Sequence, residues 1–360
     1  MAKIKDIHIE KYRGINHLDL RQFNDINVIV GKNNSGKSSL LEAIFTLFNF
    51  DNPMINFHLN KHRGYHEEDY KHSSTIEKYT ENIKSMFYQM KDKYEKIKIG
   101  CKLQDDTELK TEISVKYNFL NPLANGAAPE AKIPTQIHMK SQYGSNATQE
   151  ILVELYGPSD QTNIKHNGTI VFDTQVKLIS PSNKKTLLKE ALSGLLYDGK
   201  TTELIEFLKI IDPNVKAVTM IQDQIYFDIG IGQLMPYYLM GDGIKSLMTY
   251  IAVSLDTHNE DYSNIQNRII LIDEIENGLH YSIQSELWKM ISLISKKLNR
   301  QFIITTHSME SLYLMQEAMT LAGEANYGIF RLTRDEDGHR AMAYNATELE
   351  TASELNWEIR

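Results

Sequence analysis

Short, continuous runs of apolar residues recur along the chain, and the clearest lie at residues 26–30, 269–272 and 301–306. Apolar runs of this length without alternation are typical of strands buried on both faces, as in a parallel sheet. Residues 185–196 and 201–211 have the spacing of amphipathic helices instead. Strands and helices that follow one another in this way predict an α/β fold.

The stretch from about residue 51 to residue 180 has a different pattern. It begins with a polar, histidine-rich segment, continues with a predicted helix over 73–96, and then contains short runs typical of strands separated by turn-rich stretches. These runs are residues 96–103, 112–119, 136–142, 150–155 and 169–179. We interpret 51–180 as an insertion of one helix and a β-rich subdomain. The main domain would then be discontinuous, comprising 1–50 and 181–345, with 346–360 as a C-terminal tail.

The first candidate site directly follows the predicted strand 26–30. It fits the phosphate-loop pattern G-x-x-x-x-G-K-[ST] and leads into residues with helical spacing, so it has the strand–loop–helix context that the pattern requires. Its members are Gly31, Lys32, Asn33, Asn34, Ser35, Gly36, Lys37, Ser38 and Ser39. Backbone N–H groups of such a loop, with the helix N-terminus, bind phosphate. The loop therefore predicts ATP binding, with Lys37 at the β- and γ-phosphates and Ser38 on Mg²⁺.

Polar side chains end two of the other predicted strands. Asp273 and Glu274 follow the run 269–272, and His307 follows the run 301–306. Beside a phosphate loop, Asp273 would hold Mg²⁺ and Glu274 would polarise the attacking water, while His307 would contact the γ-phosphate or the water. The alternatives are two acids that cap the next helix and a histidine that is satisfied in the core.

Five segments together resemble the ABC-type ATPase heads of the SMC, Rad50 and RecF proteins, and most of all the OLD family and related AAA ATPases of bacterial anti-phage systems. The segments are spread over the whole chain. They read YRGI at 12–15, GKNNSGKSS at 31–39, MGDG at 240–243, DEIENGLH at 273–280 and TTHS at 305–308. The resemblance implies a P-loop NTPase of ABC type with a β-rich and helical insertion.

In this class ATP is hydrolysed between two protomers arranged head to tail. The resemblance implies that the helix start Gly241, Asp242 and Gly243 faces the nucleotide of the other protomer, and that Gly278–His280 lies near the dimer seam. This chain has Met-Gly-Asp-Gly where the family signature begins with serine. Because an aspartate facing phosphate is unfavourable, we expect Asp242 to point away or to cap its helix. Arg13 would lie near the nucleotide or form a structural salt bridge.

Many OLD-family proteins carry a TOPRIM nuclease domain, and the residues after His307 are too few to form one. Asp335–Gly338 fits a hairpin turn better than a metal site. We therefore expect an ATP-hydrolysing switch that acts as a dimer or higher oligomer and controls a separate effector, a nuclease or toxin, in anti-phage defence. The alternatives are a RecF-like repair ATPase that binds DNA, and a slow-turnover scaffold that sequesters a partner.

Composition narrows the setting. The chain has 360 residues, 41% of them hydrophobic, a formal net charge of −8 and one cysteine. It has no apolar run long enough to cross a membrane and no signal-type N-terminus, so we expect a cytoplasmic protein. The negative net charge argues against a surface that is basic throughout and binds nucleic acid, but it is compatible with a local basic groove. Three histidines have the spacing of a metal site, namely His58, His62 and His66, but we favour a solvated segment there. We interpret Lys184 and Lys185 as part of a solvated helix face.

Overall fold

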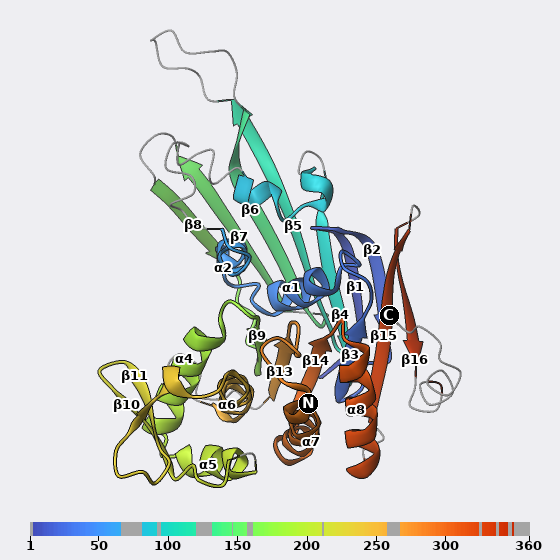
Figure 1. Cartoon of the computed structure of the whole chain (residues 1–360). Helices are drawn as coiled ribbons and strands as arrows, with labels where there is room; N and C mark the ends of the chain where they lie inside the picture. Colours follow the sequence, from blue (N-terminus) through green and yellow to red (C-terminus); the bar gives the residue numbers. More distant parts are fainter. Residues whose placement is uncertain are drawn as a thin grey trace. The chain divides into compact units, whose positions relative to one another are not determined.

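The protein is described here by a computed structural model, shown in Figure 1. It describes residues 3–65, 81–91, 95–119, 132–145, 147–156, 161–210, 212–257, 267–323, 326–335, 338–344 and 348. The chain forms two compact units. Unit 1 comprises Met1–Gln22, Asn34–Phe172 and Thr333–Ala341, and unit 2 comprises Phe23–Asn33, Asp173–Leu332 and Met342–Arg360.

Unit 1 is built on a seven-stranded sheet in the order β2-β1-β4-β5-β6-β7-β8, in which every neighbouring pair is antiparallel. From β4 to β8 the strands follow one another as a meander. The strands are β1 (Ile4–Tyr12), β2 (Ile15–Arg21), β4 (Ile97–Leu103), β5 (Glu108–Phe119), β6 (Lys132–Tyr143), β7 (Ala147–Tyr156) and β8 (Gln161–Asn167).

One face of this sheet is buried and the other is polar. Along β1 the side chains of Ile7 and Ile9 are buried, and along β2 those of Leu18 and Leu20 are buried. Alternation of this kind is expected of an antiparallel sheet that is covered on one side. The described residues of the unit include the helices α1 (Lys37–Phe48) and α2 (Ile55–His62) and a short 3₁₀ turn, η2 (Tyr88–Met90).

The division into units differs from the predicted one. Residues 3–22 and 34–50 belong with the predicted insertion, because β1 pairs with β4 along most of its length. Strand β2 was not predicted from the sequence. At the C-terminal end of the predicted insertion, β9 (Thr174–Ile179) pairs with a strand of unit 2. It therefore does not belong to the β-rich unit.

The helix predicted over 73–96 is corrected in part. Residues 73–80 lie outside the described residues, and the helical conformation that continues from 81 ends at 84. Phe87 then forms a β-bridge with Tyr12, and the Arg13 N–H donates to the Met86 carbonyl at 2.7 Å. Met86 and Phe87 are both buried. Tertiary packing of these two side chains therefore overrides the helical spacing.

Unit 2 contains the predicted parallel sheet, in the order β16-β15-β3-β14-β13-β9. The pairs β15–β3, β3–β14, β14–β13 and β13–β9 are all parallel. The strands not yet given are β3 (Ile26–Val30), β13 (Asn267–Ile272), β14 (Gln301–Thr305), β15 (Tyr327–Asp335) and β16 (Gly338–Tyr344), of which β15 and β16 run partly into unit 1. Every residue of β3, β13 and β14 is buried, as the apolar runs predict.

Helices cover one face of this parallel sheet and close the core of unit 2 (Figure 1). Val28, Phe302 and Ile270 from three neighbouring strands pack with apolar side chains of these helices, including the fully buried Trp288. The helices are α4 (Lys184–Tyr197), α5 (Thr201–Lys209), α6 (Asp242–Leu255), α7 (Tyr281–Leu298) and α8 (Met309–Leu321). A small sheet of β10 (Ala217–Ile221), β11 (Gln224–Asp228) and β12 (Met235–Pro236), then η3 (Tyr237–Leu239), precedes α6. Among the described residues, no helix has the length and apolar character to cross a membrane.

Phe302 tests the importance of this core. It lies in β14 and is 0% exposed, so Phe302→Ala removes buried contacts and leaves a cavity, at a cost of about 3–5 kcal/mol. Tyr197→Ala removes an aromatic ring that is 82% exposed and should change stability by less than about 0.5 kcal/mol. Thermal and urea unfolding of both variants measure the difference. Equal midpoints would contradict the placement of Phe302.

Candidate nucleotide site

Three parallel strands of unit 2 end side by side, and each is followed by residues of a predicted site. Backbone hydrogen bonds continue past the strand ends. The Thr306 N–H donates to the Ile29 carbonyl at 3.1 Å, and the Ile275 N–H donates to the Thr305 carbonyl at 3.1 Å. The residues that follow β3, β13 and β14 therefore share the carboxyl edge of the sheet, where α/β proteins bind their ligands.

The buried hydroxyl of Thr305 connects the two acids. Its Oγ1 donates to Asp273 Oδ1 at 2.6 Å and accepts from the Glu274 N–H at 2.8 Å. Glu274 has φ of +52°, a left-handed conformation that is uncommon for a residue with a side chain. Unusual backbone of this kind is concentrated at functional sites. Thr305 thus positions both acids, a role that the sequence motif alone did not indicate.

His307 is held by Glu276, a residue that the sequence analysis did not select. The same carboxylate oxygen, Glu276 Oε1, lies 2.8 Å from His307 Nδ1 and accepts from the His307 N–H at 2.9 Å. The His307 side chain is 53% exposed, whereas that of Glu276 is 11% exposed. The histidine is therefore not a core residue. With Nδ1 facing a carboxylate, Nε2 is the ring nitrogen able to meet a ligand.

Lys184 was expected on a solvated helix face, but it is half-buried next to the acidic loop. Its Nζ donates to the Asn277 carbonyl at 2.9 Å and to Ser246 Oγ at 3.3 Å, and lies 5.3 Å from the centre of the Tyr250 ring. Burial lowers the pKa of Lys184 to about 8, although the charges of Glu274 and Glu276 act to raise it. Because Ser246 lies in α6 and Asn277 lies in the loop after β13, this lysine links α6 to that loop.

The phosphate loop has the backbone conformation that its glycines allow. Gly31 has φ of +148°, Asn34 +64° and Gly36 +97°, and α1 begins at Lys37. The loop passes from unit 2 into unit 1 after Asn33. Lys32, Asn33 and Asn34 are exposed, while Lys37 and Ser38 are half-buried at the first turn of α1, where backbone N–H groups have no partner within the helix.

Within unit 1, two features of this loop fit a bound phosphate chain. A Cβ on Gly36 would lie 3.1 Å from Cδ2 and 3.2 Å from Nε2 of His339, a tight contact, and the φ of +97° also favours glycine at this position. Ser35 is 4% exposed, and its Oγ has no hydrogen-bond partner among the described residues. The Ser38 hydroxyl at the start of α1 is an oxygen ligand of the kind that Mg²⁺ prefers.

His339 is a residue of this loop region that the sequence did not reveal. It is 8% exposed, and neither ring nitrogen has a hydrogen-bond partner in the described part of the chain. Burial lowers its pKa, and the charge of Arg334 lowers it further. His339 lies in a strand near the end of the chain, and nothing in the sequence predicts that it lies close to Gly36.

Arg13 has protein partners that favour the structural alternative. It is 8% exposed, its Nε lies 2.6 Å from Glu42 Oε2, and its Nη2 donates to the Oδ1 atoms of Asn56 (3.1 Å) and Asn60 (2.9 Å). Glu42 also forms a two-point pair with Arg63, at 2.6 and 3.0 Å. A role of Arg13 at the nucleotide stays a prediction.

Asp242 projects into solvent at the start of α6, one of the two positions expected for it. Gly241 is the N-cap, and the Asp242 side chain is 79% exposed and pairs with Lys245 at 2.9 Å. A Cβ on Gly243 would lie 2.4 Å from Ile283 Cδ1, so this glycine allows α6 and α7 to pack closely. Of the three histidines spaced for a metal, His58 and His62 lie in α2, and His66 lies outside the described residues.

Comparison with known proteins agrees with this architecture. Residues 26–312 match the family described as "AAA domain, putative AbiEii toxin, Type IV TA system". A Helicobacter pylori protein named ATP/GTP phosphatase is 23% identical over 355 residues, 88% of each chain. The DNA replication and repair protein RecF of Staphylococcus haemolyticus is 40% identical over 45 residues, 12% of each chain.

Two solved structures are similar over nearly the whole chain. The SmcHead bound to the C-winged helix domain of ScpA has a TM-score of 0.49 and 12% identity, with 98% of this chain and 99% of that chain covered. The SMC head domain from Thermotoga maritima has a TM-score of 0.43 and 11% identity, with coverage of 95% and 99%. Both scores are below 0.5, so the assignment depends on the family match and the strand topology.

The fold and the strand-end residues define a P-loop ATPase of α/β class. The chain belongs to the AAA domain family of the AbiEii type, whose match spans the phosphate loop, the acidic strand and the strand that ends before His307. This confirms the resemblance drawn from the sequence and the predicted fold class.

The pKa of Lys184 tests its burial beside Glu274 and Glu276, in the loop after β13. Competitive acylation followed by mass spectrometry should give a titration midpoint near pH 8 for Lys184. Glu274→Gln removes a charge that raises this pKa, so the midpoint should fall further. Since the pKa is lower in the folded state than the ordinary 10.5, the contribution of this group to stability should rise between about pH 8 and 10.5. Lys185, labelled in the same samples, is the internal reference. A midpoint near 10.5 would contradict the burial of Lys184.

Proposed function

We propose that this protein binds ATP with Mg²⁺ at Gly31–Ser39 and hydrolyses it. The observation that carries the proposal is the position of Thr305, whose hydroxyl holds the Asp273 carboxylate and the Glu274 N–H at the sheet edge where the phosphate loop begins. The family match and the H. pylori relative named ATP/GTP phosphatase support it.

Each residue would have a separate role. Lys37 and the N–H groups of the loop would bind the phosphates, with Arg13 as a further contact by resemblance only. Ser38 and Asp273 would hold Mg²⁺, which neutralises phosphate charge. Glu274 would accept a proton from the attacking water, and His307 would orient that water or the γ-phosphate through Nε2.

The protein would act as a switch in a head-to-tail dimer or higher oligomer. The start of α6, Gly241–Gly243, would meet the nucleotide of a second copy. Support comes from exposed apolar side chains in the segment that precedes α6, because exposed apolar surface often marks a protein–protein contact. They are Ile231 (53% exposed), Leu234 (41%), Tyr238 (72%) and Leu239 (61%). The Lys184 bond to Ser246 offers a route by which contact at α6 changes the acidic loop.

The downstream activity would belong to a separate effector, a nuclease or toxin of a defence system. The family description, which refers to a toxin of a type IV TA system, supports this setting. A second candidate is a DNA-dependent ATPase, favoured by the short RecF match. Steady-state turnover with and without duplex DNA separates the two, because only the second predicts stimulation by DNA alone.

Glu274→Gln should bind ATP as the wild type does and hydrolyse it roughly 10²–10⁴-fold more slowly, the usual size of a general-base contribution. Turnover and nucleotide binding are measured on the same preparation. Glu317→Gln is the matched control, because Glu317 is an exposed residue of α8 and its loss should leave turnover unchanged. Wild-type turnover in Glu274→Gln would remove Glu274 from this role.

Lys37→Ala should weaken ATP binding itself. Loss of a charge-assisted contact to phosphate corresponds to about 1.5–3 kcal/mol, or roughly 10- to 100-fold in the dissociation constant. Calorimetric titration measures it, with the exposed Lys185→Ala as control. An unchanged affinity in Lys37→Ala would refute the assignment of the phosphate loop.

A further inference from the structure

A group of histidine and carboxylate side chains lies on the polar face of the β1–β2 hairpin, apart from the residues assigned to ATP. In the pairing register His8 is opposite Asp19, and Glu10 is opposite His17. Their neighbours Ile7, Ile9, Leu18 and Leu20 are buried on the other face. Because side chains alternate along a strand, all four polar side chains project from one surface.

The potential metal ligands of this group are close together. His8 Nδ1 lies 2.7 Å from Asp19 Oδ1, and His17 Nε2 lies 3.1 Å from Asp19 Oδ2. The two imidazole rings have centroids 5.2 Å apart and are inclined at 70°. One ligand atom from each of these three residues can be chosen so that all lie within 4.8 Å of one another. No such spacing is visible in the sequence, where the histidines are nine positions apart.

We propose that His8, His17 and Asp19 form a binding site for a divalent transition metal of the Zn²⁺ type. Two imidazoles and a carboxylate suit this class of ion, whereas Mg²⁺ and Ca²⁺ prefer oxygen ligands only. A tetrahedral Zn²⁺ with bonds of about 2.0–2.1 Å places its ligand atoms about 3.3 Å apart. The present spacing reaches this with small side-chain rotations, since all three side chains are at least 40% exposed.

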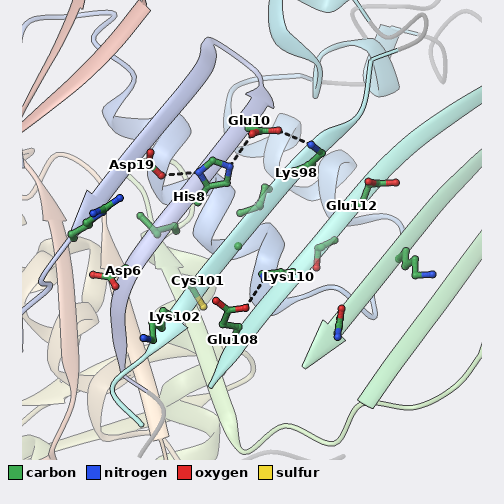
Figure 2. A pocket seen from close by; sticks show the side chains of 17 residues that line it. Asp6, His8, Glu10, Asp19, Lys98, Cys101, Lys102, Glu108, Lys110 and Glu112 are labelled. Atoms are coloured by element: carbon green, nitrogen blue, oxygen red, sulfur yellow. Dashed lines mark hydrogen bonds and ion pairs between the residues drawn. The ribbon is translucent and has the colours of Figure 1, made fainter. Parts of the chain in front are cut away.

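A second carboxylate lies next to the three proposed ligands. Glu10 Oε1 is 3.1 Å from His8 Nε2, and Glu10 Oε2 is 3.0 Å from Lys98 Nζ. Glu10 therefore contacts both Lys98 and His8. It would orient the His8 ring without binding the metal itself. His8, Glu10, Asp19 and Lys98 line a hollow of about 800 Å³. Figure 2 shows these four side chains close together on neighbouring strands.

The backbone under the site is ordered by the sheet. β1 is paired on both sides, with β2 and with β4, whereas β2 is the edge strand. A metal bound by His8 of β1 and by His17 and Asp19 of β2 would cross-link the edge strand to the interior of the sheet. The consequence is a stabilisation of unit 1 that depends on metal concentration.

The test is a Co²⁺ titration of the full chain, freed of metal and nucleotide, followed by its visible absorption and repeated calorimetrically with Zn²⁺. One equivalent should bind, with a rise in the thermal midpoint. His17→Ala and Asp19→Asn should each weaken binding by at least about tenfold. His138→Ala is the matched control, because His138 also lies on a strand, is 38% exposed, and has a carboxylate oxygen at 3.8 Å.

Two results would overturn the proposal. One is a dissociation constant for both ions weaker than about 1 mM in the wild type. The other is binding that persists unchanged in His17→Ala and Asp19→Asn, which would place the metal elsewhere, for example at His58 and His62 of α2. Thermal unfolding of each variant without metal verifies that it is folded. These outcomes are independent of ATP hydrolysis, which needs neither His8 nor His17.

Discussion

The arrangement of the ATPase core depends on one constraint, the parallel pairing of β14 between β3 and β13. This pairing brings residues 31, 273 and 305 to one edge of a sheet, although they lie far apart in the chain. Burial on both faces fixes the register, because a shift of one residue would exchange the two packed faces. The Thr305 hydroxyl bonds to Asp273 because this register places the ends of β14 and β13 at the same level.

Electrostatics around the acidic loop are shared by several elements. A half-buried lysine, Lys184, lies beside Glu274 and Glu276 and bonds to the signature helix at Ser246. Its ammonium group is costly to bury, and the adjacent carboxylates offset part of that cost. A movement of α6 would change this balance, and with it the charge around the proposed base. Lys184 therefore connects α6 physically to the loop after β13 within unit 2.

Unit 1 combines a rigid polar cluster with an exposed polar sheet face. Glu42 pairs with the buried Arg13 and the partly exposed Arg63, and Nη2 of Arg13 also donates to Asn56 and Asn60. Buried charges need such partners, because an unpaired one would carry the full desolvation cost. On the polar face of β1, the half-buried side chains of His8 and Glu10 lie opposite Asp19 and His17 of β2. Ion pairs thus stabilise the turn after β1, while the strand itself presents a polar face.

The sequence by itself determined the class of the protein, the three buried strands and the residues of the phosphate loop and acidic strand. These features are local, since a glycine-rich turn or a continuous apolar run can be recognised without knowing its neighbours in space. Only the tertiary structure decided that β1 and β2 join the β-rich unit, that Phe87 ends a predicted helix, and that Lys184 is half-buried. It also brought Thr305 and Glu276 to their hydrogen-bond partners, placed His339 next to Gly36, and paired Asp19 with His8 and His17. Such contacts follow from strand pairing and long-range packing, which leave no periodic signal in the order of residues.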